Sequence, residues 1–250
     1  MKMQFLGCGA ADYDWSRYGE AGILGSTVSL FNDHILLDCG PTAAQAMERY
    51  NVSCQQIRAV VNTHSHSDHF NVEVLKKIAG DRMIDFYGSP EACSKVENFC
   101  KVHALTFGDT FELEGCKFLA LPSNHAVENL HEETFNYLIT ADNKTLLYAL
   151  DTAWMPCRAR KLIGKTFIDA IIWDATMSEP GDWRIFEHSD PEMFSYMRKV
   201  WLQDGIISED LQVYFNHRAR TLWPADPAAQ QTVADKYNVK LAIEGETVTF

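Results

Sequence analysis

The sequence predicts an α/β fold on three observations. Apolar runs rich in β-branched and aromatic residues recur along the 250 residues, and segments with helical spacing lie between several of them. The composition, 46% hydrophobic and 22% charged, is typical of a chain that buries a core. No linker rich in proline, glycine or serine interrupts the chain, so we expect a single domain over residues 1–250.

The expected elements alternate along the chain. Strands are expected at 2–7, 26–31, 34–38, 57–63, 85–88, 117–122, 135–140, 145–151, 170–176, 211–217 and 240–245. Helices are expected at about 41–50, 71–80, 90–102, 156–165, 190–204 and 227–237. Sheets buried between helical layers follow from this mixture.

Two stretches share one pattern of strand, Asn/Asp turn, strand and terminal aspartate. They are VSLFNDHILLD (28–38) and YLITADNKTLLYALD (137–151), and each has the chemistry of a β-hairpin. Any two hairpins look alike at this level of similarity. The sequence therefore leaves open whether the chain contains two related halves, each with a carboxylate at the end of a buried strand.

Charge limits the partners that the protein can have. The 34 acidic residues outnumber the 22 basic ones, and the formal net charge is −12. This field repels nucleic acid and anionic membranes, so we expect neither as a partner. The apolar stretch before Gly7 is too short for a signal peptide, and no later run approaches membrane-spanning length. We expect a cytoplasmic protein; the sequence allows a homodimer.

The seven cysteines do not form a disulfide or zinc framework. Their number is odd, no two form a C-x-x-C pair, and most lie beside apolar residues. We expect reduced thiols in or near the core.

The stretch NTHSHSDHF (62–70) carries four metal-binding side chains directly after an expected strand. They are His64, His66, Asp68 and His69. The carboxyl end of a strand is where α/β proteins place their sites. His64 and His66 can converge on one ion, whereas Asp68 and His69 point elsewhere, so the cluster suits two neighbouring metals better than one. A solvated polar loop is the alternative, and the density of ligands argues against it.

More donors follow other expected strands. LALPSNH ends at His125, TLLYALD at Asp151 and LQVYFNH at His217. A lone histidine after a strand is more often structural, but three such endings in a chain with the cluster favour a metal centre.

The order HSHSDH, His125, Asp151, His217 resembles the metallo-β-lactamase superfamily, whose motif is H-x-H-x-D-H followed by a distant His, Asp and His. The resemblance extends from FLGCGAAD and LLDCG to FNHR. It implies a four-layer αββα sandwich with two divalent metal ions, zinc first, with manganese and iron as alternatives. It places His64, His66 and His125 on one metal, Asp68, His69 and His217 on the other, and Asp151 between both.

A further histidine favours the phosphodiesterase branch, which contains tRNA 3′-processing endonucleases and the cyclic phosphodiesterase of phosphonate breakdown. FEHSDPEMFSYMRKV carries His188 and Ser189 before an expected helix, and IIWDAT resembles the strand that precedes this element in the branch. The resemblance assigns His188 to phosphate binding or to protonation of the leaving group. The alternative is that His188 only decorates a helix start at which Ser189 or Asp190 is the N-cap.

The chain also departs from that branch. Glu187 stands where a glycine often precedes the histidine, and we find neither a tRNA-gripping arm nor a cysteine-rich zinc site. A tRNA substrate is therefore disfavoured, and a small, cyclic or linear, nucleotide or sugar phosphodiester is expected.

Further roles are assigned to single residues. Asp68 is expected to take a proton from the attacking water, and Arg218, beside His217, to bind phosphate. Asp38 is expected to accept the free N–H of a ligand histidine, although a strand-end turn explains it nearly as well. ENLHEE (128–133) is expected to be an exposed acidic loop.

Two other functions remain open at this point. Hydrolysis of a carboxylic ester, thioester or lactone would use the same ions, and His188 with the DAT element argues against it. A non-enzymatic metal-binding protein is the second alternative, but structural zinc sites are usually closed and cysteine-rich, whereas this set has seven ligands and no cysteine.

Overall fold

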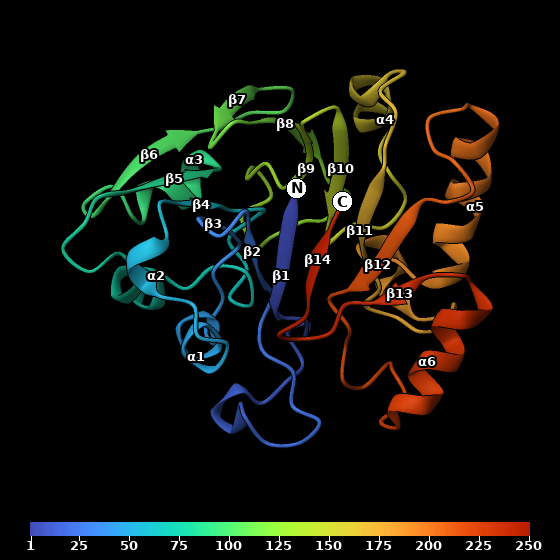
Figure 1. Cartoon of the computed structure of the whole chain (residues 1–250), viewed down its shortest axis with the longest axis horizontal. Helices are drawn as coiled ribbons and strands as arrows, with labels where there is room; N and C mark the ends of the chain where they lie inside the picture. The colour runs from blue at the N-terminus through green and yellow to red at the C-terminus, as the bar shows by residue number, and fades with distance from the viewer. The chain divides into compact units, whose positions relative to one another are not determined.

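The chain forms two seven-stranded mixed sheets in the computed structural model, which describes residues 1–250 (Figure 1). Each sheet belongs to one of two compact units. The first unit comprises residues 1–106, 127–133 and 243–249, and the second comprises 107–126, 134–242 and 250. This arrangement confirms the predicted α/β class, while the expectation of a single domain stays a prediction.

The sheet of the first unit has the strand order β14-β1-β2-β3-β4-β5-β6. Its strands are β1 (Lys2–Gly7), β2 (Val28–Phe31), β3 (Ile35–Leu37), β4 (Ala59–Val61), β5 (Ile84–Gly88), β6 (Cys100–Ala104) and β14 (Thr247–Thr249). From β3 to β6 the strands are parallel. Their carboxyl ends therefore meet at one edge, which is the edge where residues after β3 and β4 can share a site.

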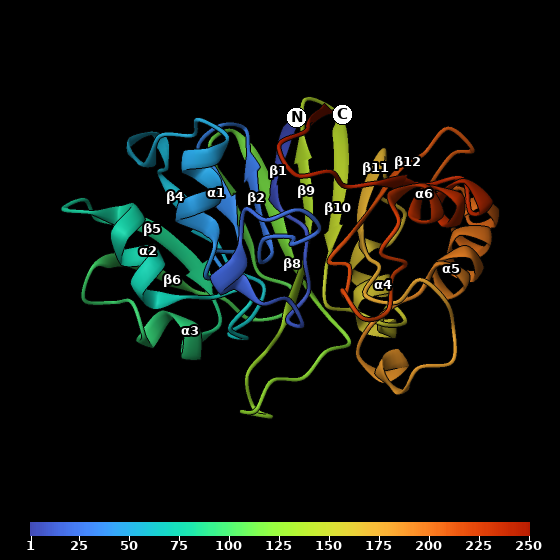
Figure 2. The same cartoon turned by 90° about the horizontal axis from the view of Figure 1, so that it is seen from below.

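Three helices cover this sheet: α1 (Ala43–Arg49), α2 (Val72–Ala79) and α3 (Pro90–Ser94) (Figure 2). Their apolar residues pack with those of the strands in one hydrophobic cluster, for example Met47 and Leu75 with Leu36 and Phe86. Short single turns of 3₁₀-helix lie at Trp15–Arg17 and Cys54–Gln56.

The sheet of the second unit has the order β13-β12-β11-β10-β9-β8-β7. Its strands are β7 (Thr110–Leu113), β8 (Cys116–Pro122), β9 (Phe135–Ala141), β10 (Lys144–Ala149), β11 (Ala170–Asp174), β12 (Gln212–Asn216) and β13 (Lys240–Leu241). Strands β10 to β13 are parallel, and β8 runs in the same direction because both β8 and β10 are antiparallel to β9. The carboxyl ends of β8, β10, β11 and β12 therefore lie along one edge.

The helices of the second unit are α4 (Cys157–Ile163), α5 (Pro191–Gln203) and α6 (Pro227–Lys236) (Figure 2). Both α5 and α6 begin with a proline after an aspartate N-cap, Asp190 and Asp226. Proline suits the first helical position because its missing N–H would have no helical partner there. Trp173 of β11 packs against Phe194 of α5 within the cluster that joins these helices to the sheet.

Both predicted hairpins are present. Strands β2 and β3 are joined through Asn32 and Asp33, and β9 and β10 through Asp142 and Asn143. All four turn residues have positive φ, which is the backbone of the tight turns that match strand twist. Asparagine and aspartate tolerate this region better than other non-glycine residues, so the sequence pattern identified both turns correctly.

The structure corrects one expected helix and adds three strands. Helix α3 ends at Ser94, and the rest of the expected helix 90–102 turns into β6, which pairs in parallel with β5. Strands β7 and β14 were also absent from the expected set. Edge strands with mixed exposure, such as β6 and β7, carry a weak sequence pattern because only one side of the ladder is paired. No helix has both the length and the apolar character needed to cross a membrane.

Candidate metal centre

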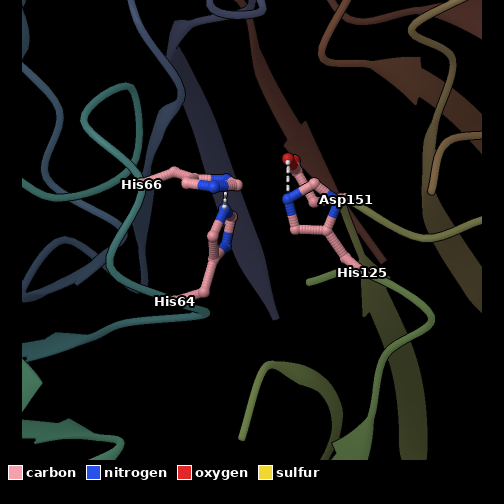
Figure 3. Close-up of side chains that lie close together, drawn as sticks. All are labelled: His64, His66, His125 and Asp151. Carbon is pink, nitrogen blue, oxygen red and sulfur yellow. Dashed lines mark hydrogen bonds and ion pairs between the residues drawn. The ribbon is translucent and has the colours of Figure 1, made fainter. Parts of the chain in front are cut away.

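In the first unit the histidine-rich loop follows β4 and turns back on itself. The main-chain N–H groups of His69 and Phe70 both donate to the carbonyl of His66. His64, Asp68 and His69 are buried, and His66 is half-buried. Nε2 of His64 lies 3.1 Å from Nδ1 of His66, so these two imidazoles converge as predicted (Figure 3).

The LLDCG segment fixes the position of this loop. The N–H of Cys39 donates to the carbonyl of His69, and Asn71 donates to the carbonyl of Cys39. A Cβ on Gly40 would lie 2.1 Å from the carbonyl oxygen of Asp68. Only glycine allows the two segments to approach this closely.

Asp38 orients two of the histidines. Its side chain has no exposed surface and accepts hydrogen bonds from the N–H and the hydroxyl of Thr63. Nδ1 of His69 lies 2.8 Å from Asp38 Oδ2, and Nδ1 of His64 lies 2.9 Å from the Thr63 hydroxyl. Since that hydroxyl donates to Asp38, each imidazole must donate from Nδ1, and each then offers Nε2 as a metal ligand. The contact expected of Asp38 is therefore present.

In the second unit Asp151 faces two histidines with its two carboxylate oxygens. Oδ2 lies 3.5 Å from Nε2 of His125, and Oδ1 lies 3.1 Å from Nε2 of His217 (Figure 3 shows the contact with His125). Asp151 and His217 are buried after β10 and β12, and the side chain of His125 after β8 is 2% exposed. The three residues that follow different strands are thus brought together along one edge of the sheet.

Asp174 and Thr176 hold the imidazole of His217. The hydroxyl of Thr176 donates to Asp174 Oδ1 and lies 2.8 Å from Nδ1 of His217. His217 must therefore donate from Nδ1, and its Nε2 faces Asp151. Nε2 of His217 and Oδ1 of Asp151 thus face each other at 3.1 Å as two acceptors. The arrangement fits a cation.

His188 belongs to the same group of side chains. Its Nδ1 lies 2.8 Å from Asp174 Oδ2, and its ring stacks on that of His217 with centroids 5.4 Å apart. Asp151, Asp174, His188 and His217 all offer ligand atoms within 4.8 Å of one another. His188 precedes α5 but does not cap it, because Asp190 accepts the N–H groups of Glu192 and Met193. Burial raises the pKa of Asp190 above its usual value.

Three of the site residues have left-handed backbone. The φ angles are 63° at Asp38, 48° at Asp151 and 59° at His217. Asp38 and His217 directly follow the ends of β3 and β12, and Asp151 lies two residues after the end of β10. Unusual backbone of this kind costs on the order of 1–3 kcal/mol per residue and clusters at functional sites.

Residues 33–198 match the family model described as the beta-lactamase superfamily domain. The chain belongs to this superfamily. The match covers more than half of the chain and contains six of the seven predicted metal ligands, with His217 beyond its end. No curated protein matches the chain in sequence.

Solved structures share the superfamily fold over the whole chain. A new diphosphatase from the PhnP family is 16% identical, with a TM-score of 0.71 over 100% of this chain and 96% of its own. Zn²⁺-bound PqqB from Methylobacterium extorquens is 15% identical, with a TM-score of 0.70 over 100% of both chains. The short form of human tRNase Z is 17% identical, with a TM-score of 0.68 over 100% of this chain and 99% of its own. The predicted metallo-β-lactamase fold is confirmed.

Superfamily membership indicates that the histidine and aspartate side chains described above are metal ligands in type. The fold family binds divalent metals, often zinc, and its members are metal-dependent hydrolases. The residues found in the two units are imidazoles and carboxylates, with no thiolate among them, and these donors suit zinc, manganese and iron. The residues present therefore fit divalent ions.

Arg218 makes hydrogen bonds to main-chain carbonyls of its own unit. The side chain is buried, and Nη1 donates to the main-chain carbonyls of Phe215 and Ala242. The guanidinium also lies over the ring of Trp223. These contacts anchor the loop that carries His217, and phosphate binding by Arg218 stays a prediction.

Sequence reasoning missed the residues that orient the histidines. Thr63, Thr176 and Asp174 were not assigned these contacts, and Glu132, expected in an exposed acidic loop, is 9% exposed. Thr63 directly precedes the predicted ligand His64, and Asp174 is the last residue of β11, so their positions were the available signal. Glu132 carried none, because its partners are 43 and 67 residues away.

Proposed function

We propose that the protein is a dinuclear metal-dependent phosphodiesterase that acts on a small nucleotide or sugar phosphodiester. The observation that carries this proposal is the Asp174–His188 pair beside Asp151 and His217. A thioester or an activated carboxylic ester can lose its leaving group without an oriented proton donor, whereas a phosphodiester with an alkoxide leaving group needs one.

In this proposal the ligands divide as the family pattern implies. His64, His66 and His125 would hold one ion, Asp68, His69 and His217 would hold the other, and Asp151 would serve both. The two oxygens of Asp151 already face different histidines, which supports a bridging role. Two divalent ions would supply an activated water and offset the negative charge on phosphoryl oxygens. Zinc is proposed first, as in the Zn²⁺-bound PqqB structure.

Two side chains of the protein, Asp68 and His188, are proposed to transfer protons. Asp68 is proposed to take the proton of the attacking water. His188 is proposed to give a proton to the departing alkoxide from Nε2, since Nδ1 is directed at Asp174. The buried carboxylate of Asp174 fixes the ring and stabilises its protonated form, as a carboxylate does behind a catalytic histidine.

The comparisons support chemistry at phosphorus, and the charge supports a small substrate. Similar structures include one described as a diphosphatase and one described as a tRNase Z. The net charge of −12 disfavours a long polyanion such as tRNA. A small diester, cyclic or linear, agrees with both observations.

A substrate panel tests the proposal. The protein is loaded with zinc or with manganese and assayed on aryl phosphodiesters, cyclic nucleotides, ribose cyclic phosphates, thioesters and lactones. We expect kcat/KM to be highest for a phosphodiester, and Asp68→Ala protein purified in parallel controls for contaminating hydrolases. Hydrolysis confined to thioesters or lactones would replace the phosphodiesterase assignment with the ester-hydrolase alternative.

A further inference from the structure

Glu132 is a buried carboxylate on a loop in which the preceding residues 128–131 are exposed. It lies in the segment 127–133, which belongs to the first unit, while the chain on both sides belongs to the second. Its residue is 9% exposed, whereas the side chain of Glu128 on the same loop is 90% exposed. Removing a carboxylate from water is costly unless hydrogen bonds replace its hydration. The hydrogen-bond partners of Glu132 therefore indicate its role in the structure.

Each oxygen of Glu132 accepts one hydroxyl. The Ser65 hydroxyl donates to Oε2 at 2.6 Å, and the Ser89 hydroxyl donates to Oε1 at 3.0 Å. Hydrogen bonds to an ionised acceptor are shorter and about twice as strong as those between neutral groups. Both contacts join residues that are distant in sequence, so they fix tertiary structure rather than a local turn.

The two serines differ in how firmly the fold holds them. Ser89 follows β5 and is the N-cap of α3, since its hydroxyl oxygen accepts the N–H of Ala92. Ser65 stands between His64 and His66, in a stretch that is neither helix nor strand. Glu132 thus connects the middle of the histidine pair to a rigid junction of the first unit.

We propose that Glu132 is a positioning residue for His64 and His66. By holding Ser65 it fixes the separation and direction of the two imidazoles, which face each other at 3.1 Å. The loop that follows His125 in sequence would thereby stabilise the other half of the ligand set. This inference rests on the proposed metal centre and does not depend on which ester the protein hydrolyses.

Two measurements on one set of variants test the proposal. The set is Glu132→Ala, Glu132→Gln, Ser65→Ala, the double variant Glu132→Ala/Ser65→Ala, and Glu133→Ala as the matched control on the neighbouring glutamate. The first measurement is the equilibrium affinity for Zn²⁺ by competition with a chromophoric chelator. The second is amide hydrogen exchange of residues 62–70 in metal-free protein.

We expect Glu132→Ala to weaken zinc binding by about 10–100-fold, the usual effect of removing a group that orients a ligand. Glu132→Gln, which keeps an acceptor for a serine hydroxyl, should restore most of the affinity. Ser65→Ala should resemble Glu132→Ala, and the double variant should be no weaker than either single one. Exchange in 62–70 should be faster in Glu132→Ala and unchanged in Glu133→Ala.

Equal affinity and equal exchange in Glu132→Ala and Glu133→Ala would overturn the proposal. If Glu132→Ala does not fold, Ser65→Ala decides, because it leaves the contact between Glu132 and Ser89 in place. The exchange measurement needs neither metal nor substrate, so failure of the positioning role is distinguishable from failure of the proposed activity. If Glu132→Ala alters the exchange but the parent protein has no phosphodiesterase activity, the positioning role of Glu132 stands and the proposed activity is wrong.

Discussion

Nδ1 of His188 lies 2.8 Å from Oδ2 of Asp174, a carboxylate with no exposed surface. The same oxygen accepts the N–H of Thr152, and the other accepts the hydroxyl of Thr176. The carboxylate therefore cannot rotate without losing several partners. His188 is held at Nδ1, and the proposed mechanism assigns proton transfer to Nε2.

His188→Ala tests this arrangement. We expect turnover of phosphodiesters with an alkoxide leaving group to fall by about 10²–10⁴-fold, the usual contribution of a positioned proton donor. Turnover of an activated carboxylic ester should change much less, because its leaving group needs no proton. Asp174→Asn should lower phosphodiester turnover in the same direction, and His131→Ala, at an exposed histidine, is the control. Equal losses on both substrate classes would contradict the role of His188.

Asp68→Ala should abolish hydrolysis and leave the fold intact. The side chain is a proposed metal ligand and proton acceptor, while the loop is held by main-chain contacts of His69 and Cys39. Circular dichroism should stay close to that of the parent, and so should the melting temperature when both proteins are compared in metal-free form. Asp81→Ala, at an exposed aspartate, controls for the loss of charge. An active Asp68→Ala protein would remove the second ion from the mechanism.

Purified protein should contain close to two transition-metal ions per chain by elemental analysis. Chelation should lower the melting temperature, because ions that bind the folded state stabilise it by mass action. Combined His64→Ala and His66→Ala substitution should lower the content by about one ion, as these residues serve one of the two proposed positions. A content near zero after expression with added zinc would contradict the whole metal assignment.

The cysteines predict a specific pattern of reactivity and pH dependence. Burial raises the pKa of both Cys93 and Cys100 to about 11, whereas Cys157 is exposed. At pH 8 a thiol reagent should label Cys157 rapidly, and Cys157→Ser should remove this phase. Cys93 and Cys100 should react only after unfolding.

The raised pKa values of Cys93 and Cys100 determine how the free energy of unfolding changes at alkaline pH. Between pH 9 and 11 the unfolded chain loses the protons of these two thiols, while the folded chain retains them. The unfolded state then binds fewer protons, so the free energy of unfolding falls as pH rises through this window. Chemical denaturation at pH 8, 9 and 10 should show the fall, and a Cys93→Ala/Cys100→Ala variant should show a smaller one.

Much of the ligand set could be predicted because strand ends are visible in the sequence. His125, Asp151 and His217 each terminate an apolar run, and parallel strands bring such ends to one edge. The hairpin turns were equally visible, since Asn32–Asp33 and Asp142–Asn143 are residue types that accept positive φ.

What could not be predicted depends on contacts between distant segments. The hydroxyl of Thr176 lies next to His217 only after β11 and β12 have paired. Glu132 resembled its exposed neighbours because no local pattern reports a partner 67 residues away. Strand β6 was mistaken for helix because no glycine or proline follows Ser94 to signal the end of α3.

The left-handed backbone at Asp38, Asp151 and His217 makes these positions recognisable without any side chain. In a trace of main-chain angles alone, a single positive φ within two residues of the end of a buried strand would mark all three. A substitution at these positions must meet two separate conditions. The new residue must tolerate the positive φ, and its side chain must supply the right donor atom. Glycine tolerates the positive φ but supplies no donor atom, whereas glutamate supplies a donor atom but tolerates the positive φ poorly. Sequence drift at these sites should consequently be narrower than at His64, where only the donor atom is constrained.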